Sequence, residues 1–283
     1  MIYELPENRY YKIKPLIHGR KETNVHLLGV IDGNNRGKIY VNDIEEPETA
    51  LIWAIGCVFA IIGNNTNENF NQALLPFLRD YLGPESIELV GGTHFYVPVY
   101  EEKWGITLEK IFEPIKNSKE FEELQNLAYV FDHNKFDSSD KSEFKLPEGF
   151  SLSKIDRDII EKDSGQHLKA NILGDFWISV ETFLKLGFGY CILNGDEVIA
   201  ACFSGYVSDE CHDIVICTYD KENRVKGFGT MVAKAYVEYC IQNGLIPFWC
   251  TTGDNFGSQR VAEKCGFELY KKRNAFLFPF RIL

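Results

Sequence analysis

The sequence lacks the features that would place the chain in a membrane or an oxidising compartment. It contains no run of about 18 apolar residues, the minimum for a membrane-spanning helix. Its first residues have neither the basic start nor the apolar core of a signal peptide. None of the eight cysteines forms a C-x-x-C pair, and most have apolar neighbours. We therefore expect free thiols, a cytoplasmic location, no membrane partner and no metal site.

Positive charge is also scarce. The 30 Lys and Arg residues face 41 Asp and Glu, which gives a formal net charge of −11. A general nucleic-acid binder needs a basic face, so we expect no nucleic-acid partner. Hydrophobic residues make up 45% of the chain and aromatic residues 14%, enough for a substantial core. The length of 283 residues allows one large domain or two ordinary ones.

Strand and helix patterns mix throughout the chain, which predicts an α/β fold with a mixed sheet. The polar stretch at 133–147 is the best candidate for a domain boundary, so we predict domains at 1–144 and 145–283. Both halves show strands, a polar loop, an amphipathic helix, a glycine, a strand and another helix. An internal duplication would explain this order, although α/β chains often share it without one.

In the first half, apolar runs on either side of Gly56 predict a strand pair. The apolar spacing over 70–82 predicts a helix that Gly83-Pro84 should stop, followed by a strand at 86–90. In the second half, Asn194-Gly195-Asp196 predicts a hairpin. The apolar run from Asp213 to Thr218 predicts a central, buried strand.

This strand leads into a glycine-spaced basic loop and then directly into an amphipathic helix. Arg224 and Lys226 bring positive charge, and Gly227 and Gly229 leave the backbone open to close approach. Unpaired N–H groups and the dipole at a helix N-terminus attract anions, so the loop predicts a phosphate site. The dinucleotide pattern G-x-G-x-x-G fails at Val232, and the Walker spacing is absent.

The remaining pattern, Arg224-x-x-Gly227-x-Gly229, resembles motif A of the GNAT acyl-CoA N-acyltransferases. Downstream, the segment from Asn255 through Ser258 and Lys264 to Gly266-Phe267 resembles their motif B. Together these matches cover residues 145–283 and imply a GNAT fold there. A less specific pattern over the full length resembles the zwittermicin-resistance acetyltransferases, whose members carry an extra N-terminal half. The first half would then be a degenerate GNAT-like repeat, because its loop at 63–69 has no Lys or Arg.

The resemblance implies transfer of the acetyl group of acetyl-CoA to a primary amine of a small molecule by direct attack. In that family the strand before the loop holds the pantetheine arm, and the loop amides hold the pyrophosphate. The residues expected to contact the cofactor are Cys217, Thr218, Tyr219, Arg224, Val225, Lys226, Gly227, Phe228, Gly229, Thr230, Asn255 and Ser258. Asn255 and Ser258 could instead cap a helix.

The amine must lose a proton before it attacks, so a base is needed. Asp213 stands where the histone-acetyltransferase branch has a catalytic carboxylate, and His212 and Glu210 are the next candidates. The resemblance assigns the oxyanion donor to the backbone N–H near Cys217. Many members protonate the leaving thiolate with a motif B tyrosine, but Ala262 occupies that position, which leaves the general acid unassigned.

Two other functions remain open at this stage. Without the motif B tyrosine, the chain could be a CoA-binding or acyl-CoA-binding regulatory protein with no catalysis. It could also acetylate a protein or peptide, although no feature of the sequence indicates a peptide groove. A tRNA-dependent aminoacyl transferase is disfavoured by the acidic charge. The identity of the acceptor and the oligomeric state are not predicted.

Overall fold

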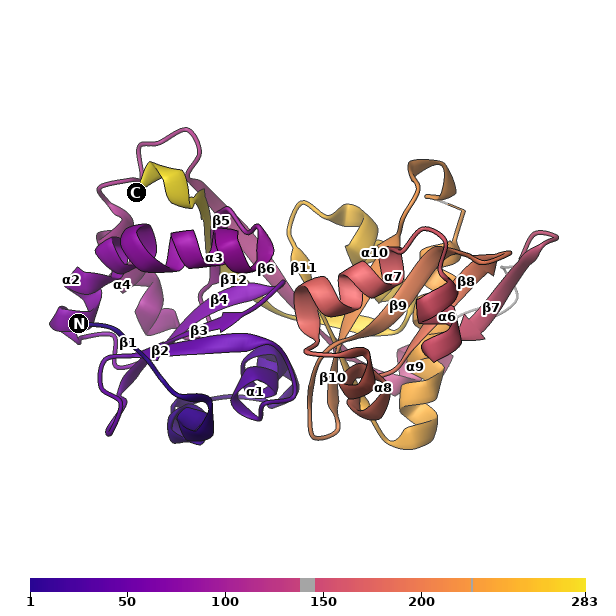
Figure 1. The fold of residues 1–283 in the computed structure, drawn as a ribbon, viewed down its shortest axis with the longest axis horizontal. Helices are drawn as coiled ribbons and strands as arrows, with labels where there is room; N and C mark the ends of the chain where they lie inside the picture. The colour runs from indigo at the N-terminus through magenta and orange to yellow at the C-terminus, as the bar shows by residue number, and fades with distance from the viewer. Residues whose placement is uncertain (138–145, 225) are drawn as a thin grey trace. The chain divides into compact units, whose positions relative to one another are not determined.

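Two strands carry the chain from one compact unit into another. The structure is a computed structural model, and it describes residues 1–137, 146–224 and 226–283 (Figure 1). Unit 1 contains Met1–Arg20, His26–Asn126 and Lys272–Leu283, and unit 2 contains Lys21–Val25 and Leu127–Lys271. Two of the four crossings fall inside β6 (Glu122–Phe131) and β12 (Phe267–Pro279), and the other two enclose Lys21–Val25. The boundary expected at 144/145 lies outside the described residues.

Unit 1 is built on a four-stranded antiparallel sheet with the order β1-β2-β3-β4. The strands are β1 (Tyr3–Glu4), β2 (Gly37–Val41), β3 (Thr49–Ala54) and β4 (Val58–Gly63). The predicted strand pair around Gly56 is β3 and β4, and Gly56 has a φ of 81° in their turn. β5 (His94–Pro98) pairs with Ala275–Pro279 of β12, which brings the end of the chain into this unit.

The helical segments of unit 1 include η1 (Glu7–Leu16), α2 (Glu68–Phe77), η3 (Leu78–Leu82), α3 (Gly83–Val90) and α4 (Glu102–Phe112). The short α1 (Val25–Ile31) follows η2 (Glu22–Asn24). The core between helices and strands is aromatic: Phe59 stacks on Phe95, and Phe112 meets Phe278 edge-on. Such pairs add directional attraction to the burial of large apolar surface.

The predicted stop at Gly83-Pro84 is wrong. Gly83 has a right-handed helical φ of −62°, and Pro84 lies in the first turn of α3. A proline is tolerated there because its missing N–H has no helical acceptor in any case. The left-handed glycine that ends this helical run is Gly91, at a φ of 67°. The segment 86–90 is therefore helix, although we predicted a strand.

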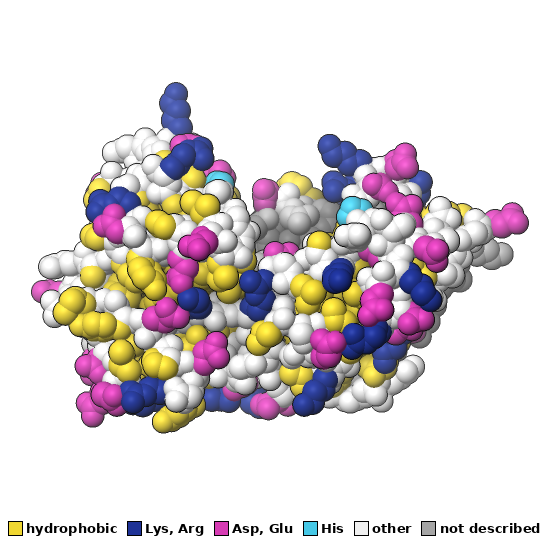
Figure 2. Space-filling model, viewed as in Figure 1, with side chains coloured by type: hydrophobic (Ala, Val, Ile, Leu, Met, Phe, Trp, Pro, Cys, Tyr) yellow, Lys and Arg dark blue, Asp and Glu magenta, His cyan; other side chains and the backbone are white. Residues whose placement is uncertain are grey.

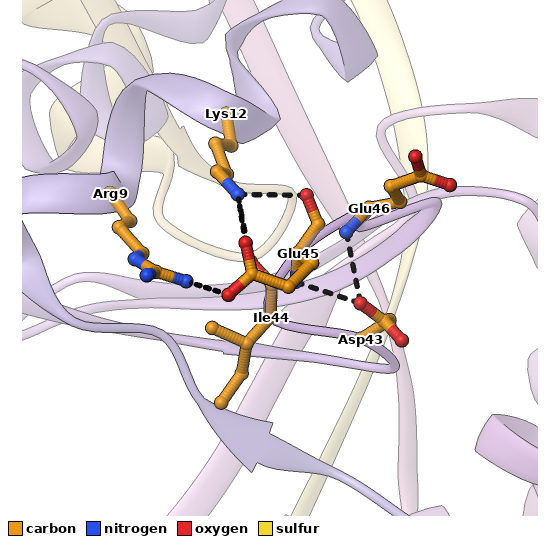
Figure 3. A network of polar contacts seen from close by, with 6 residues as sticks. All are labelled: Arg9, Lys12, Asp43, Ile44, Glu45 and Glu46. Carbon is orange, nitrogen blue, oxygen red and sulfur yellow. Dashed lines mark hydrogen bonds and ion pairs between the residues drawn. The ribbon is translucent and has the colours of Figure 1, made fainter.

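A cluster of charged side chains ties η1 to the loop between β2 and β3 (Figure 3). Arg9 forms an ion pair with Glu45, and Lys12 donates to the carbonyl of Glu45 at 2.8 Å. Asp43 accepts the backbone N–H groups of Glu45 and Glu46 at 2.7 and 2.9 Å. The paired cations lower the pKa of the Glu45 carboxyl, mainly through the hydrogen bond from Arg9. Such exposed pairs contribute little to stability, but they fix this loop locally.

Unit 2 is built on a sheet in which β6, β11, β10, β9, β8 and β7 are successive neighbours. The strands are β7 (Phe150–Lys154), β8 (Gly189–Asn194), β9 (Glu197–Ser208), β10 (Cys211–Thr218) and β11 (Ile246–Thr252). The β10–β11 pair is parallel, whereas β7 to β10 are antiparallel to one another. This mixed sheet confirms the predicted fold class, and the hairpin at Gly195 lies where the sequence indicated.

The helices of unit 2 pack on this sheet (Figure 1). They are α5 (His133–Asp137), α6 (Arg157–Lys162), α7 (His167–Asn171), η4 (Ile172–Phe176), α8 (Val180–Leu186), α9 (Phe228–Asn243) and α10 (Phe256–Lys264). α9 buries Val232, Ala233 and Tyr236 against the strands and ends at Gly244, which has a left-handed φ of 68°. None of the described helices is long and apolar enough to cross a bilayer. Acidic and basic side chains intermingle on the face shown in Figure 2.

Candidate active site

β10 presents different residues to its two sides. Because side chains alternate along a strand, Ile214, Ile216 and Thr218 face one way and Asp213 and Cys217 the other. Ile214 belongs to the core that contains the buried side of α9. The side chains of Ile216 and Thr218 lie beside Gly229, in the first turn of α9. The Asp213 side faces Gly205 and Phe176. The strand thus separates the side covered by α9, which we call the helix side, from the side lined by η4.

The ladder between β10 and β11 is short. Among the described residues, the paired positions run from Cys211 opposite Ile246 to Asp213 opposite Phe248. Both strands continue beyond this point, to Thr218 and Thr252, without further paired positions. From Val215 and Cys250 onward the side chains are half-buried, whereas those in the paired part are mostly buried. Backbone groups on these two facing edges are therefore available to a ligand that runs between the strands.

The loop after β10 delivers the chain to the N-terminus of α9. Gly227 is the N-cap residue in a left-handed conformation at a φ of 85°, and no side chain caps the helix. The Lys226 ammonium donates to the Asn223 side chain at 3.0 Å, and Arg224 is exposed at the start of the loop. A glycine at this φ avoids the strain that any other residue would carry. The first-turn N–H groups and two cations thus meet at one end of a 16-residue helix.

The structure places most of the expected loop residues together. Phe228 is buried and stacks on Phe150 at 5.3 Å, and Thr230 is buried in the first turn of α9. Tyr219 stacks on His167 at 4.6 Å, and burial raises the pKa of its phenol. These rings fix both ends of the loop. Val225 lies outside the described residues.

Asp213 is only 3% exposed and lies at an irregularity in the sheet. His212 pairs with Val207 and Ile214 pairs with Ser204, so two residues of β9 oppose Asp213 alone. This is a β-bulge on β9, made of Gly205 and Tyr206. A Cβ at Gly205 would lie 3.1 Å from Oδ2 of Asp213, so the carboxylate comes close to the backbone there. A carboxylate oxygen of Asp213 also lies within 4.8 Å of the Cys250 sulfur, across the end of the ladder.

The two alternative bases have different surroundings. His212 is buried on the helix side, and burial lowers the pKa of its imidazole to about 4, so the ring is neutral near pH 7. Its Nδ1 lies 3.1 Å from the Ser204 hydroxyl. Glu210 is in the turn before β10, and its carboxylate lies 3.9 Å from the Lys21 ammonium. Because neighbouring side chains on a strand point to opposite faces, His212 and Asp213 face opposite sides of the sheet.

Cys217 is half-buried on the same side of β10 as Asp213. Burial, helped by the charge of Asp175, raises the pKa of its thiol, so the side chain is protonated near pH 7. A protonated thiol is a poor nucleophile. Asp175 belongs to η4, which Trp177 anchors through a 2.9 Å hydrogen bond to the carbonyl of Ser204. No local pattern in the sequence marks Asp175, because an acidic residue between helical segments is usually solvated.

The segment resembling motif B contains the whole of α10, from its N-cap Asn255 onward. Asn255 caps this helix by accepting the Ser258 N–H at 3.1 Å. The Ser258 hydroxyl accepts the indole N–H of Trp249 at 2.9 Å. Asn255 therefore takes the helix-capping role that the sequence left open, whereas the Ser258 side chain is hydrogen-bonded to β11 and caps no helix. Ala262 is fully buried, so α10 presents no phenol at that position.

Gly205, Ser204 and Tyr236 were also missed by the sequence analysis. Gly205 lies inside the long apolar strand β9, and a glycine within a strand pattern is a signal for a bulge or a close backbone approach. Ser204 and Tyr236 carry no such signal, because their partners come from distant parts of the chain.

Comparison with known proteins identifies the family. A model of the GNAT acetyltransferases matches residues 14–276. The chain belongs to the GNAT acetyltransferase family. It is 23% identical over 268 residues to the uncharacterized N-acetyltransferase YdfB of Bacillus subtilis, a match that covers 95% of both chains.

Solved structures show the same fold. A GCN5-related N-acetyltransferase-like protein from Streptococcus suis is 23% identical with a TM-score of 0.67, covering 96% of this chain and 98% of that one. A tandem GNAT protein from the clavulanic acid biosynthesis pathway is 11% identical with a TM-score of 0.61, covering 99% and 98%. Because the tandem protein matches nearly the whole length, the likeness supports a GNAT-like fold for the first half as well.

Proposed function

We propose that this GNAT acetyltransferase transfers the acetyl group of acetyl-CoA to a primary amine of a small molecule. The observation that carries the proposal is the sequence of two features along β10: a ladder to β11 that ends at Asp213, and a loop that leads to the uncapped N-terminus of α9. An extended pantetheine arm can pair with the facing strand edges. The pyrophosphate can then accept N–H groups from Gly227, Phe228 and Gly229. We also propose that, within the GNAT family, the chain is most similar to the zwittermicin-resistance acetyltransferases.

Asp213 is the proposed base. The acceptor arrives as an ammonium, gives up one proton to the Asp213 carboxylate directly or through a water, and attacks the thioester carbonyl. The C–N bond forms and the C–S bond breaks, and the second proton of the nitrogen passes to the departing CoA thiolate, directly or through water, which releases CoA as the thiol. The backbone N–H near Cys217 would donate to the oxygen that gains negative charge. The protonated thiol of Cys217 takes no part in this step.

The phosphate-binding part of the proposal can be tested on Gly227. Gly227→Glu introduces negative charge and an unfavourable backbone conformation at the N-terminus of α9. Gly195→Glu is the matched control, because Gly195 also has a positive φ, of 62°, but lies in the hairpin between β8 and β9. We expect the dissociation constant of acetyl-CoA, measured by titration calorimetry, to rise at least about 100-fold for Gly227→Glu only. Unchanged affinity in Gly227→Glu would rule out the loop.

Catalysis needs a separate test, in which the protein is incubated with acetyl-CoA and a panel of primary amines while free CoA thiol is measured. We expect saturable release that depends on the amine. The alanine at position 262 favours a second function, because the residue has no phenol to protonate the thiolate. Tight binding of acetyl-CoA with no thiol release on any amine would identify a regulatory acyl-CoA-binding protein instead.

A further inference from the structure

A buried polar network crosses unit 2 on the helix side of β9 and β10. Its centre is the hydroxyl of Ser204, which is fully buried. This oxygen lies 3.1 Å from Nδ1 of His212 and 2.8 Å from the Tyr236 hydroxyl. It also accepts the backbone N–H of Phe188 at 3.2 Å. We call Phe188, Ser204, His212 and Tyr236 the Ser204 network. A buried polar group is costly unless it is paired, so the network needs a reason to exist in an apolar core.

The donors in the network can be assigned. Tyr236 is fully buried, and burial raises the pKa of its phenol, so the hydroxyl keeps its proton and donates it to Ser204. The Phe188 N–H and the Tyr236 O–H then fill both lone pairs of the Ser204 oxygen. The Phe188 carbonyl already accepts the Ser204 N–H at 2.9 Å. The Ser204 proton has two acceptors within reach, the Phe188 carbonyl at 3.2 Å and Nδ1 of His212 at 3.1 Å, and the neutral imidazole that accepts it carries its own proton on Nε2.

This hydrogen bond spans the β-bulge. Ser204 is the last residue of β9 on one side of the bulge, where it pairs with Ile214. His212 is the first residue of β10 on the other side, where it pairs with Val207. The Ser204–His212 bond thus joins the two ends of the irregular stretch, and Asp213 lies between them. The carboxylate of Asp213 emerges on the opposite side of the sheet, beside Gly205.

At the bulge, two residues of β9 face Asp213 alone. The two strands could realign as a regular ladder if one of them moved by a single position. Such a move turns every side chain of the shifted stretch to the other side of the sheet. Asp213 would then face the apolar packing of α9 and leave the η4 side. A hydrogen bond between residues at both ends of the bulge opposes this shift, because only the bulged register places Ser204 next to His212.

We propose that the Ser204–His212 hydrogen bond, oriented by Tyr236, is a positioning device that fixes the β9 bulge and thereby holds Asp213 in place for proton transfer. This inference rests on the proposed function, in which Asp213 is the base. None of the four residues of the Ser204 network would touch the substrate. They act through the backbone on either side of Asp213.

The test compares four variants of the full chain. Ser204→Ala removes the donor, and His212→Leu removes the acceptor. His212→Asn keeps a side-chain acceptor close to the position of Nδ1. Val237→Ala is the control, because Val237 is fully buried on α9 next to Tyr236 but has no polar side chain, so its loss weakens the same core. Thermal unfolding and titration of acetyl-CoA identify variants that have lost the fold.

We expect Ser204→Ala and His212→Leu to lower kcat at least about 10-fold, because a displacement of about 1 Å in a catalytic group has large effects on rate. The KM for acetyl-CoA should stay within about 2-fold of the wild type. His212→Asn should recover most of kcat, and Val237→Ala should lose stability while it keeps kcat. A loss of kcat in Val237→Ala that matches Ser204→Ala at equal loss of stability would overturn the inference, as would full activity in Ser204→Ala.

Hydrogen exchange provides a readout that needs no turnover. In Ser204→Ala the backbone N–H groups of Asp213 and Ile214 should exchange at least about 10-fold faster, while those of β8 keep their protection. Uniform or unchanged exchange across the sheet would contradict a role in the bulge. If the wild-type protein releases no CoA with any amine, the proposed function fails, and the exchange result alone then decides whether Ser204 holds the bulge.

Discussion

The indole N–H of Trp249 donates a 2.9 Å hydrogen bond to the hydroxyl of Ser258, and this bond ties β11 to the first turn of α10. It gives a structural role to a serine that the sequence associates with the cofactor. Removal of the hydroxyl would leave a buried indole N–H without its acceptor, because Trp249 is only 1% exposed.

We therefore predict that Ser258→Ala costs about 1–2 kcal/mol of unfolding free energy. The affinity for acetyl-CoA should change less than about 3-fold. Denaturant unfolding and titration calorimetry measure the two effects, and Trp249→Phe serves as the partner variant, since it removes the same bond from the other side. A large loss of affinity at unchanged stability would show that the serine acts on the cofactor instead.

The assignment of the base predicts that Asp213→Asn lowers kcat about 100-fold or more with the KM for acetyl-CoA unchanged, because only proton removal is lost. Glu210→Gln is the control, since Glu210 lies three residues earlier in an exposed turn and was itself a candidate base. Steady-state kinetics at saturating amine give the comparison. Equal losses in the two variants would point to a general effect of charge.

The buried imidazole of His212 makes stability depend on pH. Its pKa is about 4 in the folded chain and about 6.5 in the unfolded chain, so the unfolded state binds more protons between these values. The stability that the chain has while the His212 imidazole is neutral is complete above pH 6.5, and it is lost as the pH falls toward 4. We expect the free energy of unfolding to drop by about 2 kcal/mol between pH 7.5 and pH 5. His212→Asn has no titrating ring, so this part of the slope should disappear from its urea-unfolding profile.

In the proposed mechanism Cys217 contributes only its backbone, so the thiol should be dispensable. We predict that Cys217→Ala keeps kcat within about 3-fold of the wild type, because the backbone N–H proposed to donate to the thioester oxygen remains. The raised pKa of the thiol further predicts slow alkylation at pH 7. Asp175→Asn should speed that alkylation, since one of the two causes of the shift is removed. Rapid loss of activity on alkylation of Cys217→Ala would show that another thiol matters.

Local signals in the sequence predicted much of unit 2. The loop from Arg224 to Gly229, the helix that follows it and the hairpin at Gly195 all depend on residues close in the chain. Failures came where distant segments decide. Gly83-Pro84 can end one helix or begin the next, and the residues packed around it select the second outcome. The crossings inside β6 and β12 have no local mark in the sequence, because these strands pair with distant parts of the chain.

The same limit applies to the candidate site. Arg224, Gly227 and Gly229 could be named from their spacing, because a phosphate site needs glycine, positive charge and a helix N-terminus in sequence order. Ser204 and Tyr236 could not, since they are 32 residues apart and meet only in the folded chain. Asn255 and Ser258 were named by the resemblance, but their side-chain partners became visible only in the structure.

The return of the last residues to unit 1 constrains how the protein can be made. β5 lacks its partner until Ala275–Pro279 has been synthesised, and the first unit's core includes Phe276, Phe278 and Phe280. The unit that begins first therefore cannot be completed until these residues have left the ribosome. In a protein whose domains follow one another along the chain, an N-terminal domain can fold during translation as soon as it has been made, whereas unit 1 must wait until unit 2 has been synthesised.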